Sequence, residues 1–195
     1  MTSSTDNHFV AQAVHDLGSA MWFGGTLMGI AGVNKSGSEL TQGIDRVRVA
    51  SSAWARYAPA QWSGIAATLL AGLQLTRVGG RRVALQKGFG SVGALKAGLA
   101  VAGAGASAYA AYCGSRIGAL AEQAAQRGEQ LEVKDATLPT AGTPEEIARW
   151  QRRQRVTQFA VPVLAGANIV CGSWLVQSYR AGATLKGIAG RLLPH

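Results

Sequence analysis

Charged residues are scarce in this sequence. Asp, Glu, Lys and Arg make up 15% of its 195 residues, where about 25% is usual for a soluble domain. Four stretches of 18 to 24 residues contain no charged residue, namely 17–34, 57–76, 97–115 and 156–179. An apolar helix of roughly 20 residues spans the ~30 Å hydrocarbon core of a bilayer. The sequence therefore predicts four transmembrane helices.

Metal ligands are also few, with two cysteines and three histidines. Zinc and haem sites need several such side chains together, and His8 and His195 lie near the two ends of the chain. Cys113 and Cys171 are expected at different depths of the third and fourth helices, too far apart for a disulfide. We expect no metal and no cofactor, while a haem shared with another subunit stays open.

Catalytic patterns are missing as well. The chain has no HExxH motif and no evident Ser/His/Asp set, paired carboxylates or phosphate-binding loop. The segment 88–93 reads Gly-Phe-Gly-Ser-Val-Gly, but a dinucleotide site needs a strand before this motif and an acidic residue about 20 positions after it. A basic loop precedes it, and the next acidic residue is Glu122. We therefore expect a protein that is not an enzyme.

Glycine, by contrast, is abundant at 26 residues, and the mean hydropathy is only +0.11. A water-soluble, Ala-rich helical bundle is the alternative interpretation. Each helix of such a bundle carries charges on its outer face, and glycine weakens a helix in water by roughly 1 kcal/mol relative to alanine. Glycine is more frequent in membrane helices. The composition thus favours a multi-pass protein of the cell membrane.

The expected fold class is all-α, a bundle of four transmembrane helices in one domain, 1–195. Helical spacing extends the third helix beyond the membrane to Gly128, and Thr143-Pro144-Glu145-Glu146 has the pattern of a capping box that starts the last helix. An extramembrane helical hairpin is therefore predicted between helices 3 and 4. The boundaries are about 10–33, 57–76, 92–115 and 156–179 for the spans, 116–155 for the hairpin and 180–195 for an amphipathic tail.

Small residues predict how the helices pack. Membrane helices associate where small side chains let their backbones approach. The third span repeats such residues every four positions: Ala94, Gly98, Ala102, Ala106, Ala110 and Gly114. The first span offers Gly25 and Gly29, and the second offers Gly64, Thr68 and Gly72. We expect the third helix to be central, with the first two packed against it.

A polar layer is predicted inside the membrane. Because the spans alternate in direction, His15, Asp16, Gln74, Lys96 and Trp174 are expected at comparable depth. Ionisable groups there mark a pathway, a ligand site or a structural pair. Three interpretations remain open: Lys96 reaches the interface while Asp16 caps a helix end, the two form a neutralising pair, or His15 and its neighbours bind a ligand or proton.

The net charge of +9 suggests anionic partners. The loop between the second and third spans is basic and should face lipid headgroups through Arg77, Arg81, Arg82 and Lys87. Aromatic residues alternate with arginine only next to spans, around Trp54 and Trp150, so membrane anchoring explains them better than nucleic acid does. The expected partners are lipids and membrane protein subunits or a second copy. Basic residues near the span ends leave the membrane orientation open.

The chain resembles the small, Ala/Gly/Arg-rich four-helix membrane proteins of actinobacteria. The resemblance is carried by His-Asp-Leu-Gly-Ser-Ala-Met-Trp-Phe-Gly-Gly at 15–25, Trp-Ala-Arg-Tyr-Ala-Pro at 54–59 and Thr-Pro-Glu at 143–145. It covers most of the chain and implies no particular activity. The pattern from His15 to Gly25 is also similar to the first helix of copper-resistance-D-type membrane proteins, although the chain lacks the further His and Met residues of a copper path.

These features favour a non-enzymatic accessory or scaffolding subunit of a membrane complex. Two alternatives stay open. One is a membrane protein that handles a solute, a metal or protons through the His15, Asp16 and Lys96 layer. The other is a redox subunit associated with haem or quinone.

Overall fold

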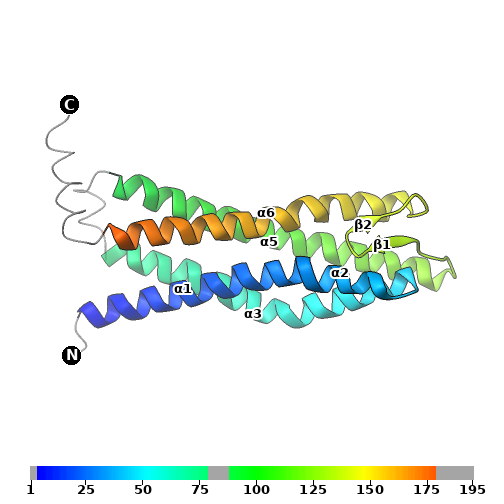
Figure 1. The fold of residues 1–195 in the computed structure, drawn as a ribbon, viewed down its shortest axis with the longest axis horizontal. Coiled ribbons are helices and arrows are strands. Elements are labelled where there is room, and N and C mark those ends of the chain that lie inside the picture. Colours follow the sequence, from blue (N-terminus) through cyan, green and yellow to red (C-terminus); the bar gives the residue numbers. More distant parts are fainter. Residues whose placement is uncertain (1–3, 79–87, 179–195) are drawn as a thin grey trace.

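The chain folds into four long antiparallel helices, as the computed structural model of residues 4–78 and 88–178 shows (Figure 1). The amphipathic tail predicted at 180–195 lies outside the described residues. The main helices are α1 (Ser4–Met28), α3 (Gly43–Val78), α5 (Phe89–Gln126) and α6 (Glu145–Gln177). Helix α1 continues through the π-helical turn η1 (Gly29–Val33), α2 (Asn34–Ser36) and η2 (Gly37–Glu39). The all-α prediction is confirmed, with two short strands in addition.

The four helices pack as two pairs. Helix α1 runs along α3, and α5 runs along α6; the pairs then join through α3 with α5 and through α1 with α6. The expectation that the third helix is central is therefore wrong. The most deeply buried large side chain is Trp22 of α1, which is fully buried and donates a hydrogen bond from Nε1 to Ser107 Oγ of α5 at 3.1 Å.

The packing face of α5 also differs from the predicted one. Gly98 and Ala102 are exposed, and a Cβ added at Gly98 would meet nothing within 4 Å. Ala106 is partly buried against the Trp22 cluster, which consists of Trp22, Ile65, Val161 and Ala165. The close approach occurs at Gly103, where an added Cβ would lie 2.6 Å from Trp22 Cη2. Adjacent helical residues point about 100° apart, so the spacing identified small residues but not the buried face.

The glycines of α1 do mark close contacts. An added methyl group would overlap Tyr57 at Gly25 and Trp54 at Gly29. Gly18 and Gly64 face each other, and a Cβ on either would lie within 3 Å of the other's carbonyl oxygen. The backbones of α1 and α3 thus touch directly. This is the packing that small residues permit between membrane helices.

The helices are longer than the predicted spans. Asp45, Arg46 and Arg48, which precede the second span predicted at 57–76, belong to α3, and Pro59, close to the predicted start of that span, lies inside the helix. At 1.5 Å per residue, α3 and α5 are each about 55 Å long, well beyond the ~30 Å of a bilayer core. The added length stabilises a separate cluster of buried residues at one end of the bundle: Val47, Ile117, Ala121, Leu131, Val133 and Ile147.

The connection between α5 and α6 closes that end. As predicted, α5 ends before Gly128, which has φ +74°. The amide of Gly128 donates to the Ala125 carbonyl and that of Glu129 to the Ala124 carbonyl, the two bonds of a Schellman motif. Strands β1 (Val133–Asp135) and β2 (Leu138–Pro139) then pair antiparallel. The sequence predicted a helical hairpin, and the structure adds these two short strands to it.

The start of α6 differs by one residue from the predicted capping box. The Pro144 carbonyl accepts the Ala148 amide at 2.9 Å, so Pro144 is the N-cap. The Thr143 hydroxyl accepts the Thr140 amide and donates to the Glu132 carbonyl. Because Thr143 closes the loop, its side chain is not used to cap the helix.

The surface changes character along the bundle. The hairpin end carries most of the ion pairs among the described residues, including Arg48 with Glu122 at 2.7 Å and Arg152 with Glu145 at 2.6 Å. The hydrogen bonds from Arg48 lower the pKa of the Glu122 carboxyl below its usual range. The other end exposes large apolar side chains on all four helices, among them Phe9, Leu17, Leu70, Val101, Val163 and Val170.

Two helices within the described residues, α5 and α6, are long and apolar enough to cross a membrane. Only 17% and 28% of their most apolar 18-residue windows are buried in the bundle. Burial inside a soluble core therefore does not account for their apolar composition. The prediction of four spans is not confirmed for α1 and α3.

Candidate functional site

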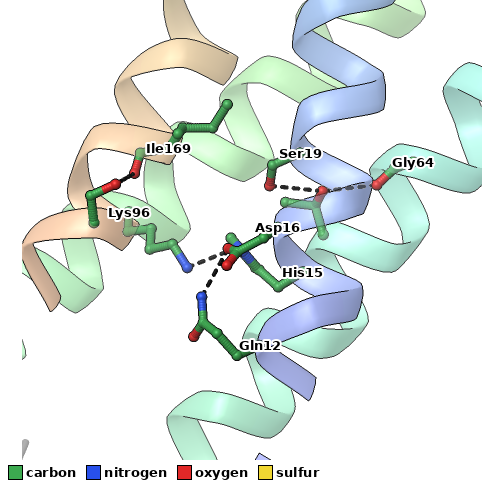
Figure 2. Close-up of polar contacts among 9 residues, drawn as sticks. Gln12, His15, Asp16, Ser19, Gly64, Lys96 and Ile169 are labelled. Atoms are coloured by element: carbon green, nitrogen blue, oxygen red, sulfur yellow. Dashed lines mark hydrogen bonds and ion pairs between the residues drawn. The ribbon is translucent and has the colours of Figure 1, made fainter. Parts of the chain in front are cut away.

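The candidate site joins α1 to α5 through His15. His15 is 2% exposed, and its Nε2 lies 2.8 Å from Nζ of Lys96. Its Nδ1 lies 3.2 Å from Oδ1 of Asp16. Figure 2 shows the Lys96 side chain reaching from α5 toward the imidazole, with Asp16 beside it. The structure thus brings together the three ionisable residues that the sequence placed in one layer.

The partners of His15 define its tautomer. A carboxylate only accepts hydrogen bonds, so His15 Nδ1 carries the proton and donates it to Asp16. The unprotonated Nε2 then accepts from the Lys96 ammonium group. The imidazole is neutral in this arrangement and links an anion to a cation. Such a link can transfer a proton along its length or hold two helices together.

Asp16 lies at the open end of this arrangement. Its side chain is 61% exposed and also accepts a hydrogen bond from Gln12 Nε2 at 2.8 Å (Figure 2). The direct Asp16 and Lys96 pair considered from the sequence is replaced by a bridge through His15. His15 follows the spacing that buries Ser19 and Trp22 on the same face of α1, whereas Asp16 lies one position away from this face.

Gln74 and Trp174 do not join the bridge. Gln74 is exposed on α3, and Trp174 is 45% exposed on α6. Neither side chain hydrogen-bonds to His15, Asp16 or Lys96. Their depth along the helices was the basis of the prediction, and depth does not determine the direction in which a side chain points.

Two glycines make room for the bridge, and sequence reasoning did not assign them to it. A Cβ at Gly72 of α3 would lie 3.6 Å from His15 Cδ2, and one at Gly172 of α6 would lie 3.3 Å from Lys96 Cε. All four helices therefore contribute to the surroundings of His15 and Lys96. The sequence pointed to Gly72 only as a small residue for helix packing and did not single out Gly172, because the residues that each glycine contacts depend on the tertiary structure.

Further buried polar residues continue from this bridge along the bundle interior. Ser19 pairs with Thr68 at 3.2 Å, Trp22 with Ser107, and Asn34 Nδ2 with Gln158 Oε1 at 2.8 Å. On α1, the buried polar positions follow helical spacing: His15, Ser19, Thr26 and, after the π-helical turn, Asn34. That periodicity is the signal in the sequence from which this polar interior could have been predicted.

Asn168 of α6 belongs to the same interior. It is fully buried, and neither its Oδ1 nor its Nδ2 has a hydrogen-bond partner among the described residues. It lies one helical turn from Gly172, which adjoins Lys96, and one turn from Ala165 of the Trp22 cluster. A buried amide with no partner destabilises a protein by about 1–3 kcal/mol. The interior near the bridge therefore contains a polar side chain that no hydrogen bond among the described residues satisfies.

The basic loop is only partly described. Arg77 lies exposed in the last turn of α3, as its expected role at the headgroups requires. Arg81, Arg82 and Lys87 lie outside the described residues, so their contact with lipid headgroups stays a prediction.

Within residues 4–78 and 88–178, no group of three or more His, Cys, Asp or Glu side chains is placed to hold a metal ion. Cys113 and Cys171 are both free. No protein-family model, curated protein or solved structure matches the chain. Function is therefore inferred from the geometry of the chain itself.

Proposed function

We propose that the chain is a non-enzymatic, multi-pass protein of the cell membrane that acts as an accessory or scaffolding subunit. The observation that carries the proposal is the reversal of surface character along the bundle. The hairpin end has an apolar core under charged side chains, as a water-exposed domain does. The opposite end has hydrogen-bonded polar side chains inside and large apolar side chains outside, as expected in lipid.

Charge distribution supports the same proposal for all four helices. Within residues 17–34, 57–76 and 156–178 no charged side chain occurs, and within 89–115 the only one is Lys96. Lys96 is only partly exposed, and its amino group lies 2.8 Å from His15 Nε2, so its charged end has a partner inside the bundle. Transferring the exposed Leu, Val and Phe side chains to lipid is favourable by about 25 cal/mol per Å² of apolar surface.

The lipid boundary is testable by site-directed labelling. We take a variant with Cys113 and Cys171 replaced by alanine and introduce Val170→Cys. A fluorophore is attached to the new cysteine, and the labelled protein is placed in vesicles of brominated lipid. Val170 is 68% exposed on α6, so strong quenching by the bromines is expected. The matched control is Arg149→Cys on the same helix, where the label should escape quenching. If the free thiol of the unlabelled Val170→Cys variant reacts with a water-soluble thiol reagent, and the fluorophore attached there in a separate sample is not quenched, the bundle is not embedded.

The exposed small residues of α5 support a role in binding other subunits. Gly98 and Ala102 are exposed, and Cβ atoms added at Gly93, Gly98 and Gly105 would meet nothing within 4 Å. A small-residue surface facing lipid lets a second helix approach closely. The partner is another membrane subunit or a second copy of this chain.

The subunit role predicts that Gly98→Leu alters association without altering folding. We expect the variant to elute in mild detergent as a smaller particle, because a leucine there would separate the two helices. The particle mass and the chains that copurify are the measurement, and Val101→Leu on the same helix is the control. An unchanged particle in Gly98→Leu would argue against this surface.

A second candidate function is favoured by the His15 bridge. An imidazole held between a carboxylate and an ammonium group supports proton or solute handling. Asn168, which has no hydrogen-bond partner among the described residues, lies one helical turn from Gly172, the glycine beside Lys96. In this alternative the bridge itself is the site of function, and its substitution would abolish transport while the bundle stays folded.

A further inference from the structure

A cavity of about 370 Å³ lies between α3 and α5 near the hairpin end. Its walls are built mainly from small side chains, which leave the space between the helices unfilled. Ala136 and Thr137, in the connection between β1 and β2, also line the cavity. The small residues that line it include Ala55 and Ala58 of α3 and Ala110, Ala111, Gly114 and Gly118 of α5. Its volume is within the range of small-molecule sites in proteins.

Most polar groups in the cavity wall already have partners. Trp54 Nε1 donates to Asn34 Oδ1 at 3.0 Å, Asn34 Nδ2 donates to Gln158 Oε1, and Gln158 Nε2 lies 3.4 Å from Thr137 Oγ1. These bonds fix the orientation of the wall across α2, α3 and α6. These linked side chains are thus held in place by one another and have few unused donors or acceptors for a ligand.

Among the described residues that line the cavity, Gln154 of α6 is the one with a buried polar atom that has no partner. It lines the cavity, is only 9% exposed, and its Oε1 is buried with no hydrogen-bond partner among the described residues. A buried acceptor without a partner is unfavourable, and a donor supplied by a ligand would satisfy it. No Asp, Glu, Lys, Arg or His is among the described residues that line the cavity. An ionised ligand would lose its hydration there without a compensating charge.

We propose that this cavity binds an uncharged, mainly apolar molecule that carries a hydroxyl group. The hydroxyl donates to Gln154 Oε1, and the apolar body lies against Trp54, Trp62 and the small residues of α3 and α5. The site lies where the charged surface of the hairpin end gives way to the apolar surface. A molecule with one polar group and an apolar body has its lowest free energy at such a boundary. The site depends only on residues of this chain and on no partner subunit.

The chemistry is testable with two neutral probes, 2-naphthol and its methyl ether, 2-methoxynaphthalene. Titration calorimetry measures the binding of each to the full chain purified in detergent. We expect saturable binding of both, with 2-naphthol bound about tenfold more tightly, the difference expected for one hydrogen bond. Equal affinities would overturn the hydroxyl requirement, and the absence of saturable binding would overturn the site.

Two substitutions locate the binding. Gln154→Leu keeps the approximate size of the side chain and removes the acceptor, so the preference for 2-naphthol should disappear. Ala110→Phe should fill the cavity and abolish binding of both probes. Their controls are Gln123→Leu and Val101→Phe, at exposed positions of α5, which should bind as the unmodified chain does.

A blocking variant is informative only if it folds. If Ala110→Phe does not yield folded protein, Ala58→Phe on the opposite wall is the second blocking variant. Unchanged probe binding in the folded blocking variant, or a hydroxyl preference that persists in Gln154→Leu, would overturn the proposal. Binding to purified protein does not depend on the membrane labelling result, so failure of either proposal is distinguishable from failure of the other.

Discussion

Replacing Gly103 with leucine is expected to destabilise the bundle strongly, whereas the same change at Gly98 is not. A Cβ at Gly103 would lie 2.6 Å from Trp22 Cη2 and 2.8 Å from Cζ2, both in a fully buried indole ring. Overpacking of this kind typically costs about 1–3 kcal/mol. We expect a value at the upper end, because Trp22 also donates to Ser107 and cannot move without losing that bond.

Gly98→Leu is the matched control on the same helix. Both substitutions replace an interior helical glycine and so gain similar helix propensity, roughly 0.8 kcal/mol. The difference between the two variants therefore isolates the contact with Trp22. The measurement is the free energy of unfolding in mixed micelles titrated with dodecyl sulfate. Equal losses at both positions would contradict the packing of α1 against α5 through Trp22.

Substituting His15 with leucine is expected to have the second large effect. It would leave the Lys96 ammonium group without its acceptor in a partly buried position. Leaving a buried polar group unsatisfied costs about 1–3 kcal/mol, and more for a charged group. Gly72 and Gly172 surround the site closely, so the leucine side chain does not compensate by new packing.

A double variant tests whether His15 and Lys96 act as a pair. His15→Leu with Lys96→Met removes both polar partners and replaces them with apolar side chains of similar size, which is often nearly neutral. We expect the double variant to recover most of the stability lost by His15→Leu alone. Asp16→Asn is the control, because its amide oxygen still accepts from Nδ1 and its side chain is largely exposed. Additive losses from the two single changes would show that the groups are not coupled.

The same variants discriminate the two proposed functions. If the double variant is folded and still associates with its partners, the bridge is a structural link between α1 and α5. If it is folded but has lost a transport activity that the unmodified chain has, the bridge is the site of that activity. Stability and activity are therefore measured on the same preparations.

Some features of the site were predictable from residue type and position alone. His15, Asp16 and Lys96 were placed at one depth because the helices alternate in direction and each residue advances a helix by 1.5 Å. Gly25 and Gly29 were identified as contact points because small residues permit close approach. The Gly128 helix end followed from the left-handed conformation that glycine adopts readily.

Other features were not predictable because they depend on the rotation of each helix. In a soluble helix, charges mark the outer face, but α5 has only Lys96 among its first 27 residues. Gly98, Ala102 and Gly103 are equally small and apolar, so composition does not distinguish the exposed residues from the one that contacts Trp22. The strands at Val133–Asp135 and Leu138–Pro139 likewise form through pairing within the hairpin connection, and neither is long enough to show strand periodicity.

The sequence by itself determined that the chain forms long helices with uncharged segments of bilayer length, because length and charge are properties of each segment alone. Only the tertiary structure decided which helices pair, that His15 rather than Asp16 contacts Lys96, and that a cavity beside Gln154 remains between α3 and α5. These outcomes depend on how four helices rotate against one another, and that rotation is set by contacts such as Gly18 with Gly64 and Gly103 with Trp22.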